Sequence, residues 1–270
     1  MTQTPRTIVV QRRDAVQWVR LDRPEARNAI NKAMRDELID AFLAADSDPG
    51  VRALVVTGSG RDFCTGGELM PTGRGGELMP RGGGSLIDYP RTLRPFQDLF
   101  RVYWELETPV VSAVNGTTAG VGWMLALLAD LVVAAEGARW THAFARRGMV
   151  PHAGDPFFLP RVLPLHRLSE VALLSETLTS EVLAEWGAVN RLVAADAVEA
   201  VADELSQRLA TGATRSLGLT KRLYRRSLTN DMATIFLEEA DATALISQTA
   251  DRREGVAAFR EGRRPNFTGR

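Results

Sequence analysis

The stretch PVVSAVNGTTAGVGWMLALLADLVVAA, residues 109–135, joins an apolar run, a glycine-rich turn, a helical pattern and a second apolar run. Short apolar runs predict buried strands, and strands that alternate with helices are typical of an α/β sheet with crossover connections. The turn at 115–123 would present successive backbone N–H groups at a helix start, where the helix dipole adds positive potential. This stretch therefore predicts an α/β fold class and a place for an oxygen that becomes negative during a reaction.

The same order of elements occurs before this stretch. Residues 7–24, TIVVQRRDAVQWVRLDRP, predict a hairpin of two β-rich runs around an Arg-Arg-Asp turn. Asn31 is expected to cap the helix that follows, because apolar residues then recur at three- and four-residue spacing. Residues 51–60, VRALVVTGSG, have the pattern of a short buried strand that ends in glycines.

The β signals become sparse from about residue 166. Residues 189–194, VNRLVA, are the last run that predicts a strand, and helical periodicity dominates the remainder. We therefore expect an α/β core over residues 1–195 and a helical C-terminal region over residues 196–270.

Composition and charge exclude several classes of function. The 270 residues carry 33 Lys and Arg against 33 Asp and Glu, so there is no global field to attract nucleic acid or an anionic membrane. Cys64 is the only cysteine, which rules out an internal disulfide and is typical of a reducing, cytoplasmic setting. No signal-peptide pattern is expected, and the most apolar stretch is interrupted by Asp130. Three histidines and one cysteine provide no zinc-type spacing, so no metal is expected.

A second glycine-rich turn occurs in SGRDFCTGGEL, residues 59–69. If it faces the turn at 115–123, the two could hold one oxyanion between them. For either turn alone, the simpler interpretation is that glycine permits a tight turn and close packing. Neither turn fits a dinucleotide or phosphate-loop motif. The hexapeptide GGELMP occurs at 66–71 and again at 75–80, which predicts a long loop beside the site.

Four segments in succession resemble the crotonase (enoyl-CoA hydratase/isomerase) superfamily. They are RPEARNAINKAMRDEL (23–38), GSGRDFCTGGEL (58–69), residues 109–135, and RREGVAAFREGRRPNFTG (252–269). The resemblance implies a spiral of ββα units with a helical C-terminal region that mediates assembly into a homo-trimer or hexamer. It also implies that the substrate is an acyl-CoA thioester, with coenzyme A as part of the substrate and no other cofactor.

The resemblance also assigns roles to individual residues. The backbone N–H groups of Thr65 and Val121 would form an oxyanion hole for the thioester oxygen. Phe259 and Arg263 would approach the adenine end of coenzyme A, in one interpretation from a neighbouring subunit, whereas Arg263 could equally be a solvated charge. The remaining residues expected to contact substrate or coenzyme A are Glu25, Ala26, Arg27, Phe63, Gly66, Gly67, Glu68, Gly120, Met124 and Phe144.

Two of these residues bear on the reaction. Met124 and Phe144 stand where hydratases of the family place catalytic glutamates, and neither can transfer a proton. Ordinary hydration is therefore not expected, because it needs a positioned base for water and an acid for the α-carbon.

The segment FARRGMVPHAGDPFFLPRVLP, residues 144–164, supplies a substitute. It resembles the branch that contains the ring-epoxide isomerase of phenylacetate degradation and related enoyl-CoA isomerases. That branch has a catalytic aspartate where this chain has His152. Histidine titrates near neutrality and could move the one proton that a double-bond shift requires, with Asp155 orienting its ring. In the alternative interpretation His152 only caps a turn; His142 and His166 are weaker candidates.

We thus expect an acyl-CoA isomerase of the crotonase fold. Two alternatives stay open at this point. One is a protein that binds acyl-CoA without turning it over, and the absence of the two glutamates at positions 124 and 144 is the reason to consider it. The other is a hydratase with an acid and base from elsewhere in the chain.

Overall fold

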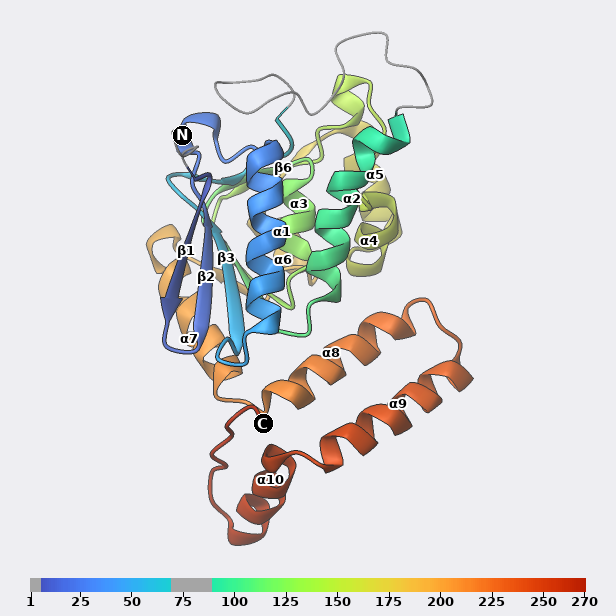
Figure 1. Ribbon diagram of the computed structural model, residues 1–270. Helices are drawn as coiled ribbons and strands as arrows, with labels where there is room; N and C mark the ends of the chain where they lie inside the picture. Colours follow the sequence, from blue (N-terminus) through green and yellow to red (C-terminus); the bar gives the residue numbers. More distant parts are fainter. Residues whose placement is uncertain (1–5, 69–88) are drawn as a thin grey trace, which may run out of the picture.

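A computed structural model describes residues 6–68 and 89–270 (Figure 1). Its main sheet has the strand order β1-β2-β3-β5-β7-β10, in which β1 and β2 are antiparallel and the other neighbours are parallel. The hairpin predicted at the start of the chain is confirmed, and its turn contains Asp14 in the left-handed region (φ 52°). The six strands are β1 (Ile8–Arg13), β2 (Val16–Leu21), β3 (Ala53–Gly58), β5 (Val110–Val114), β7 (Leu131–Ala135) and β10 (Arg191–Val193).

A second sheet has the order β4-β6-β8-β9, with β8 and β9 antiparallel. These four strands were not predicted from the sequence. Each has only three residues, which is too short for a period of two to be recognised. The strands are β4 (Asp62–Cys64), β6 (Thr117–Ala119), β8 (Arg139–Thr141) and β9 (Thr177–Thr179).

Helices cover both faces of the main sheet. The predicted cap of α1 is confirmed, since the side chain of Asn31 accepts a hydrogen bond from the Met34 amide at 2.8 Å. The helices are α1 (Lys32–Ser47), α2 (Tyr89–Glu105), α3 (Gly122–Leu127), α4 (Asp155–Val162), α5 (Leu165–Leu174), α6 (Ser180–Glu185), α7 (Val198–Ala210), α8 (Thr214–Ser227), α9 (Met232–Ser247) and α10 (Ala250–Glu261). Three short 3₁₀ turns complete the described elements: η1 (Pro24–Ala26), η2 (Ala145–Arg147) and η3 (Ala195–Ala197). No helix in the described ranges is both long and apolar enough to span a membrane.

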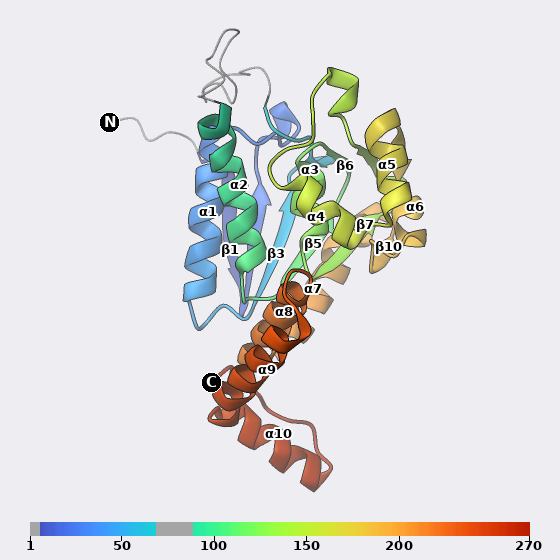
Figure 2. The same cartoon turned by 90° about the vertical axis from the view of Figure 1, so that its right-hand side faces the viewer.

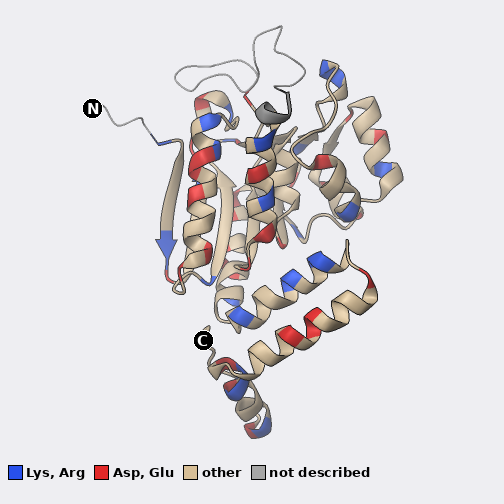
Figure 3. Cartoon of the chain, turned by 45° about the vertical axis from the view of Figure 1, so that its right-hand side comes forward, with Lys and Arg blue, Asp and Glu red and all other residues tan. Residues whose placement is uncertain are grey.

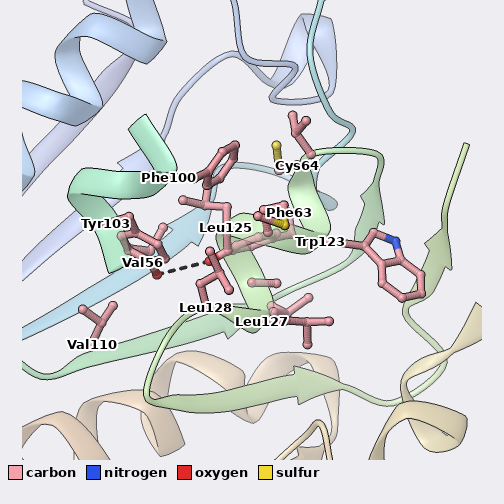
Figure 4. Packing of buried hydrophobic residues seen from close by; sticks show 14 of the residues in the cluster. Val56, Phe63, Cys64, Phe100, Tyr103, Val110, Trp123, Leu125, Leu127 and Leu128 are labelled. Atoms are coloured by element: carbon pink, nitrogen blue, oxygen red, sulfur yellow. Dashed lines mark hydrogen bonds between the residues drawn. The ribbon is translucent and has the colours of Figure 1, made fainter. Parts of the chain in front are cut away.

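The larger hydrophobic core lies between the main sheet and helices α1, α2 and α3. Figure 4 shows side chains of β3, β4, α2 and α3 packed together there, with the Tyr103 hydroxyl donating to the Leu125 carbonyl oxygen at 3.1 Å. Alternate residues of β3 face opposite sides, so Leu54 joins this core and Val55 joins the other. This core holds α3 rigidly, and α3 begins at the turn that was expected to bind an oxyanion.

The smaller core lies on the opposite face of the sheet and is covered by α7. Val198, Ala202 and Leu205 of this helix pack against β3, β5 and β7. Residues 196–270 were predicted to form the C-terminal region, whereas α7 packs on the core and the helices that leave the core begin with α8. The physical reason is the apolar face of α7, which covers buried sheet residues.

Helices α8, α9 and α10 extend away from the sheets (Figures 1 and 2). Basic residues on α8 face acidic residues on α9 (Figure 3), and Arg226 pairs with Glu238 at 3.2 Å. Helix α8 is fixed to the core by Asp130, whose carboxylate pairs with Lys221 at 2.7 Å and Arg225 at 2.9 Å. Burial lowers the pKa of Lys221 to about 8, because desolvation disfavours the charged amine more than Asp130 favours it.

Candidate active site

The two glycine-rich turns meet in the structure, as the sequence suggested. Parallel pairing of β4 with β6 places the turn after Cys64 beside the turn before α3. Gly66 has φ 101°, and a Cβ atom there would lie 2.9 Å from the Ala119 carbonyl oxygen. A Cβ atom on Gly122 would lie 2.3 Å from the Cys64 carbonyl oxygen. The approach of the two backbones therefore requires glycine at both positions.

Each turn offers a backbone N–H group near the other. Within the described residues, the Val121 amide, at the start of α3, donates to no protein acceptor. The Thr65 amide donates to the Arg27 carbonyl oxygen at 3.3 Å, which is longer than an ordinary N–H···O bond. The Thr65 hydroxyl donates to the same oxygen at 2.9 Å, so this acceptor keeps a partner if the amide turns to a ligand.

A cavity joins these turns to the segment after β8. His152 lies at its edge, half-buried, with its ring at 5.0 Å from the Phe144 ring in an edge-on arrangement. The structure thus brings His152 and both predicted N–H donors to one cavity. Its lining residues are Thr65, Gly66, Gly67, Gly120, Val121, Ala143, Phe144, Arg147, Met149 and His152.

Asp155 was predicted from the sequence to orient the His152 ring, but the structure contradicts this prediction. Its carboxylate Oδ2 instead lies 2.9 Å from Nε2 of His142, and both side chains are buried. His152 contacts its own turn, with Nδ1 at 3.3 Å from the Val150 carbonyl oxygen. The reason for the difference is local: Asp155 begins α4, and the turn directs its side chain into the protein while His152 stays at the cavity.

Met124 was predicted to contact the substrate, but it does not line the cavity. It is fully buried beneath the turns, so only Phe144 of the two glutamate-replacing residues faces the site. Cys64 is also excluded as a proton carrier, because burial raises the pKa of its thiol to about 12. His152 is then the titratable group best placed at this cavity. His166 is exposed on α5 and is not among the cavity-lining residues.

The residues expected near coenzyme A divide into two groups. Arg27 is exposed on one side and forms two hydrogen bonds with the buried Asp62, at 2.9 and 3.1 Å, which raise the pKa of the guanidinium and hold the segment after η1 in place. Glu25 is exposed beside it. Phe63, in contrast, is fully buried in the larger core, and Glu68 is buried and paired with Arg23 at 3.0 Å. The structure therefore leaves the Phe63 side chain no surface for coenzyme A.

Phe259 and Arg263 lie far from the cavity of their own chain. Helix α10 is at the opposite end of the molecule from β6 in both views (Figures 1 and 2). Phe259 is 89% exposed, and Arg263 pairs with Glu254 at 2.6 Å and Glu261 at 2.6 Å. A contact with this cavity would need a neighbouring copy of the chain. Most of the duplicated segment at 66–80 lies outside the described residues.

Three cavity residues were not singled out from the sequence. Ala143 lies before η2, Arg147 is the last residue of η2, and Met149 follows it. The pattern ARRGM gave no signal by itself, because a pair of arginines is more often a solvated surface. Within residues 6–68 and 89–270, no three His, Cys, Asp or Glu side chains come together as a metal site.

The chain is similar to known proteins over almost its whole length. Residues 11–270 match the family described as Enoyl-CoA hydratase/isomerase. A relative from Escherichia coli (strain K12), 1,2-epoxyphenylacetyl-CoA isomerase, is 36% identical over 255 residues, which cover 94% of this chain and 95% of that protein. The 2,3-dehydroadipyl-CoA hydratase of the same organism is 30% identical over 264 residues, covering 97% of this chain and 99% of the relative.

Solved structures agree with these matches. An enoyl-CoA hydratase from Mycobacterium tuberculosis H37Rv superimposes with a TM-score of 0.85 at 30% identity, covering 98% of this chain and 100% of that one. The crotonase-type fold and the family predicted from the sequence are confirmed by these comparisons, and the similarity to 1,2-epoxyphenylacetyl-CoA isomerase agrees with the predicted resemblance. Relatives named as isomerases and as hydratases occur together, so their names do not decide which reaction this chain catalyses.

Proposed function

Because the chain belongs to the enoyl-CoA hydratase/isomerase family, we propose that it shifts a carbon–carbon double bond within an acyl-CoA thioester. The main support for this proposal is that one cavity is lined by His152 and by both glycine-rich turns. Among the residues that the structure describes, none that lines this cavity is a carboxylate. Hydration needs a group to activate water as well as one to protonate carbon, whereas a double-bond shift needs one group that accepts a proton and returns it.

The proposed reaction proceeds through an enolate. Neutral His152 removes a proton from the α-carbon of a 3-enoyl-CoA, and the electron pair moves to the thioester oxygen. The N–H groups of Thr65 and Val121 stabilise that oxyanion, each contributing about 3 kcal/mol in comparable sites. The imidazolium then returns the proton to the γ-carbon, and the double bond comes to lie between the α- and β-carbons. Phe144 limits access of water to the proton carrier.

The reaction is tested by following both positions of the double bond. We expect purified protein to convert a 3-enoyl-CoA into its 2-enoyl isomer, measured by NMR, and to add water to crotonyl-CoA much more slowly. Binding of acyl-CoA in calorimetry with no turnover of either substrate would instead support the binding-protein alternative. Turnover of crotonyl-CoA at ordinary enzymatic rates, about 1–10³ per second, would establish the hydratase alternative.

We also propose that the chain assembles with copies of itself through α9. This helix has one buried residue, Ala242, and exposes Met232, Phe236, Leu237 and Leu245. Several exposed apolar side chains on one helix favour association, because burying each of them contributes roughly 1.5–3 kcal/mol. Assembly into a trimer or hexamer would also let α10 of one copy approach the cavity of another.

The assembly is tested by sedimentation. The wild-type chain is expected to sediment as three or six copies, and the double substitution Phe236→Glu/Leu237→Glu is expected to produce monomers, since charges on that face oppose burial. The matched control Glu239→Lys changes an exposed charged residue of the same helix and should leave the assembly intact. A wild-type monomer, or an unchanged oligomer of the double variant, would contradict the proposal.

A further inference from the structure

A buried imidazole–carboxylate pair lies directly behind the cavity. His142 follows β8, Asp155 begins α4, and Nε2 and Oδ2 are 2.9 Å apart. The side chains are 0% and 4% exposed. His142 is not among the residues that line the cavity, so it is not placed to touch a substrate there.

This pair is an inefficient way to stabilise a fold. Burying two ionisable groups costs desolvation energy that their attraction often fails to exceed, and apolar residues of similar volume commonly serve as well. Within the described residues, Nδ1 of His142 is also buried without a hydrogen-bond partner, which adds a further cost. A pair of this kind is better explained by the conformation that it selects than by stability.

The conformation in question is that of the turn that carries His152. Ala153 is buried at φ 61° and Gly154 has φ 91°, so two consecutive residues occupy the left-handed region. A non-glycine residue there is strained and needs surrounding contacts to hold it. The Asp155 amide donates to the His152 carbonyl oxygen at 3.2 Å, and the Asp155 side chain joins that end of the turn to β8 through His142.

An aromatic contact links the pair to His152 a second time. The Phe144 ring lies with its centroid 5.0 Å from the His142 ring and 5.0 Å from the His152 ring. Trp123 of α3 packs edge-on against His142 at 5.9 Å. Both imidazoles therefore pack against one phenyl ring, and a change at His142 is transmitted to the ring against which His152 rests.

We propose that His142 and Asp155 are positioning residues that fix the turn at Val150–Asp155, and with it the His152 imidazole, against the two N–H donors. This inference rests on the proposed function, since it assigns the pair to the orientation of the proton carrier. Their hydrogen bond performs the task, and a change in the charge of His142 plays no part.

The test compares variants that keep the hydrogen bond with variants that remove it. His142→Gln retains an N–H donor for Asp155 but cannot ionise, and it should keep most of the turnover. The double substitution His142→Leu/Asp155→Ala removes both polar partners and leaves no buried charge. It should fold, bind acyl-CoA with nearly the same affinity and lower kcat on the order of a hundredfold, the loss typical of a misplacement of about 1 Å. His166→Gln, on an exposed residue, is the matched control.

Two activity results would overturn the proposal. Full turnover by the double variant would mean that the pair positions nothing. A folded His142→Gln variant as inactive as the double variant would mean that His142 acts by ionising.

A spectroscopic readout separates this inference from the proposed reaction. The chain has three histidines, so their imidazole NMR signals are assignable by substitution. The His152 signal should move in the double variant and stay in place in the His142→Gln and His166→Gln variants. If the wild-type protein turns over no enoyl-CoA while the His152 signal moves, the reaction is wrong and the positioning role stands. An unmoved His152 signal in the double variant contradicts the positioning role whatever the activity.

Discussion

Replacing His152 with alanine is expected to lower the turnover of 3-enoyl-CoA by about 10²–10⁴-fold, the usual contribution of a positioned acid or base. Affinity for acyl-CoA should stay nearly unchanged, because the oxyanion donors are backbone groups of Thr65 and Val121 and are independent of that side chain. Steady-state kinetics with calorimetry on the same preparation measures both quantities. The loss should therefore fall on kcat, and KM should change little.

The pH dependence of the same variants identifies the group that ionises. A base must be deprotonated to accept the proton, so wild-type activity should rise through one ionisation on the acidic side and then reach a plateau. His152→Asp should retain some activity and shift the rise to lower pH, since a carboxyl group ionises near pH 4, about 3.9 in model peptides. Full activity of His152→Ala with an unchanged pH profile would show that another group carries the proton.

Substituting Gly66 with alanine is the second change with a large expected effect. The new Cβ would lie 2.9 Å from the Ala119 carbonyl oxygen, and the backbone at φ 101° is unfavourable for any residue with a side chain. The two turns must then separate, and the Thr65 amide moves away from the Val121 amide. We expect kcat to fall by about 10²–10³-fold, as when one oxyanion donor is lost, and the free energy of unfolding to fall by about 1–3 kcal/mol.

Gly187→Ala is the matched control for this substitution. Gly187 also has a positive φ (80°), but a Cβ atom there would meet nothing within 4 Å. It should share the conformational cost in thermal or denaturant unfolding and keep full turnover. If Gly66→Ala retained wild-type kcat, the contact between the two turns would not support catalysis, and the proposed oxyanion hole would be wrong.

The features that could be predicted are those that depend on residues close together in the sequence. Two glycine-rich turns at strand-to-helix junctions suggested an oxyanion site if they faced each other, and the resemblance to the crotonase superfamily placed its donors at Thr65 and Val121. The pairing of β4 with β6 brings those turns together. The hairpin at the start of the chain and the Asn31 cap of α1 were also predictable, because each depends on residues a few positions apart.

What the sequence could not supply depends on contacts across space. Asp155 was predicted to orient His152 because it is three residues away, whereas the turn directs its carboxylate to His142 on another element. The boundary at residue 195 failed to anticipate α7 on the sheet, since a helical pattern does not say which surface its apolar face will meet. Met124 was expected at the cavity and is buried below it, because the helical pattern of α3 does not show which of its residues face the cavity.

The most direct measurement is exchange of the substrate's α-proton with solvent deuterium. In deuterated water, the wild-type chain should incorporate deuterium at the γ-carbon of the 2-enoyl-CoA product and at the α-carbon of recovered 3-enoyl-CoA, because an enolate forms and the imidazolium of His152 exchanges its proton with solvent before it returns one to carbon. His152→Ala should incorporate none above the rate in buffer, although it still binds the ligand. Equal incorporation by both proteins, or none by the wild type with bound acyl-CoA, would contradict the assignment of His152 as the proton carrier at the oxyanion site.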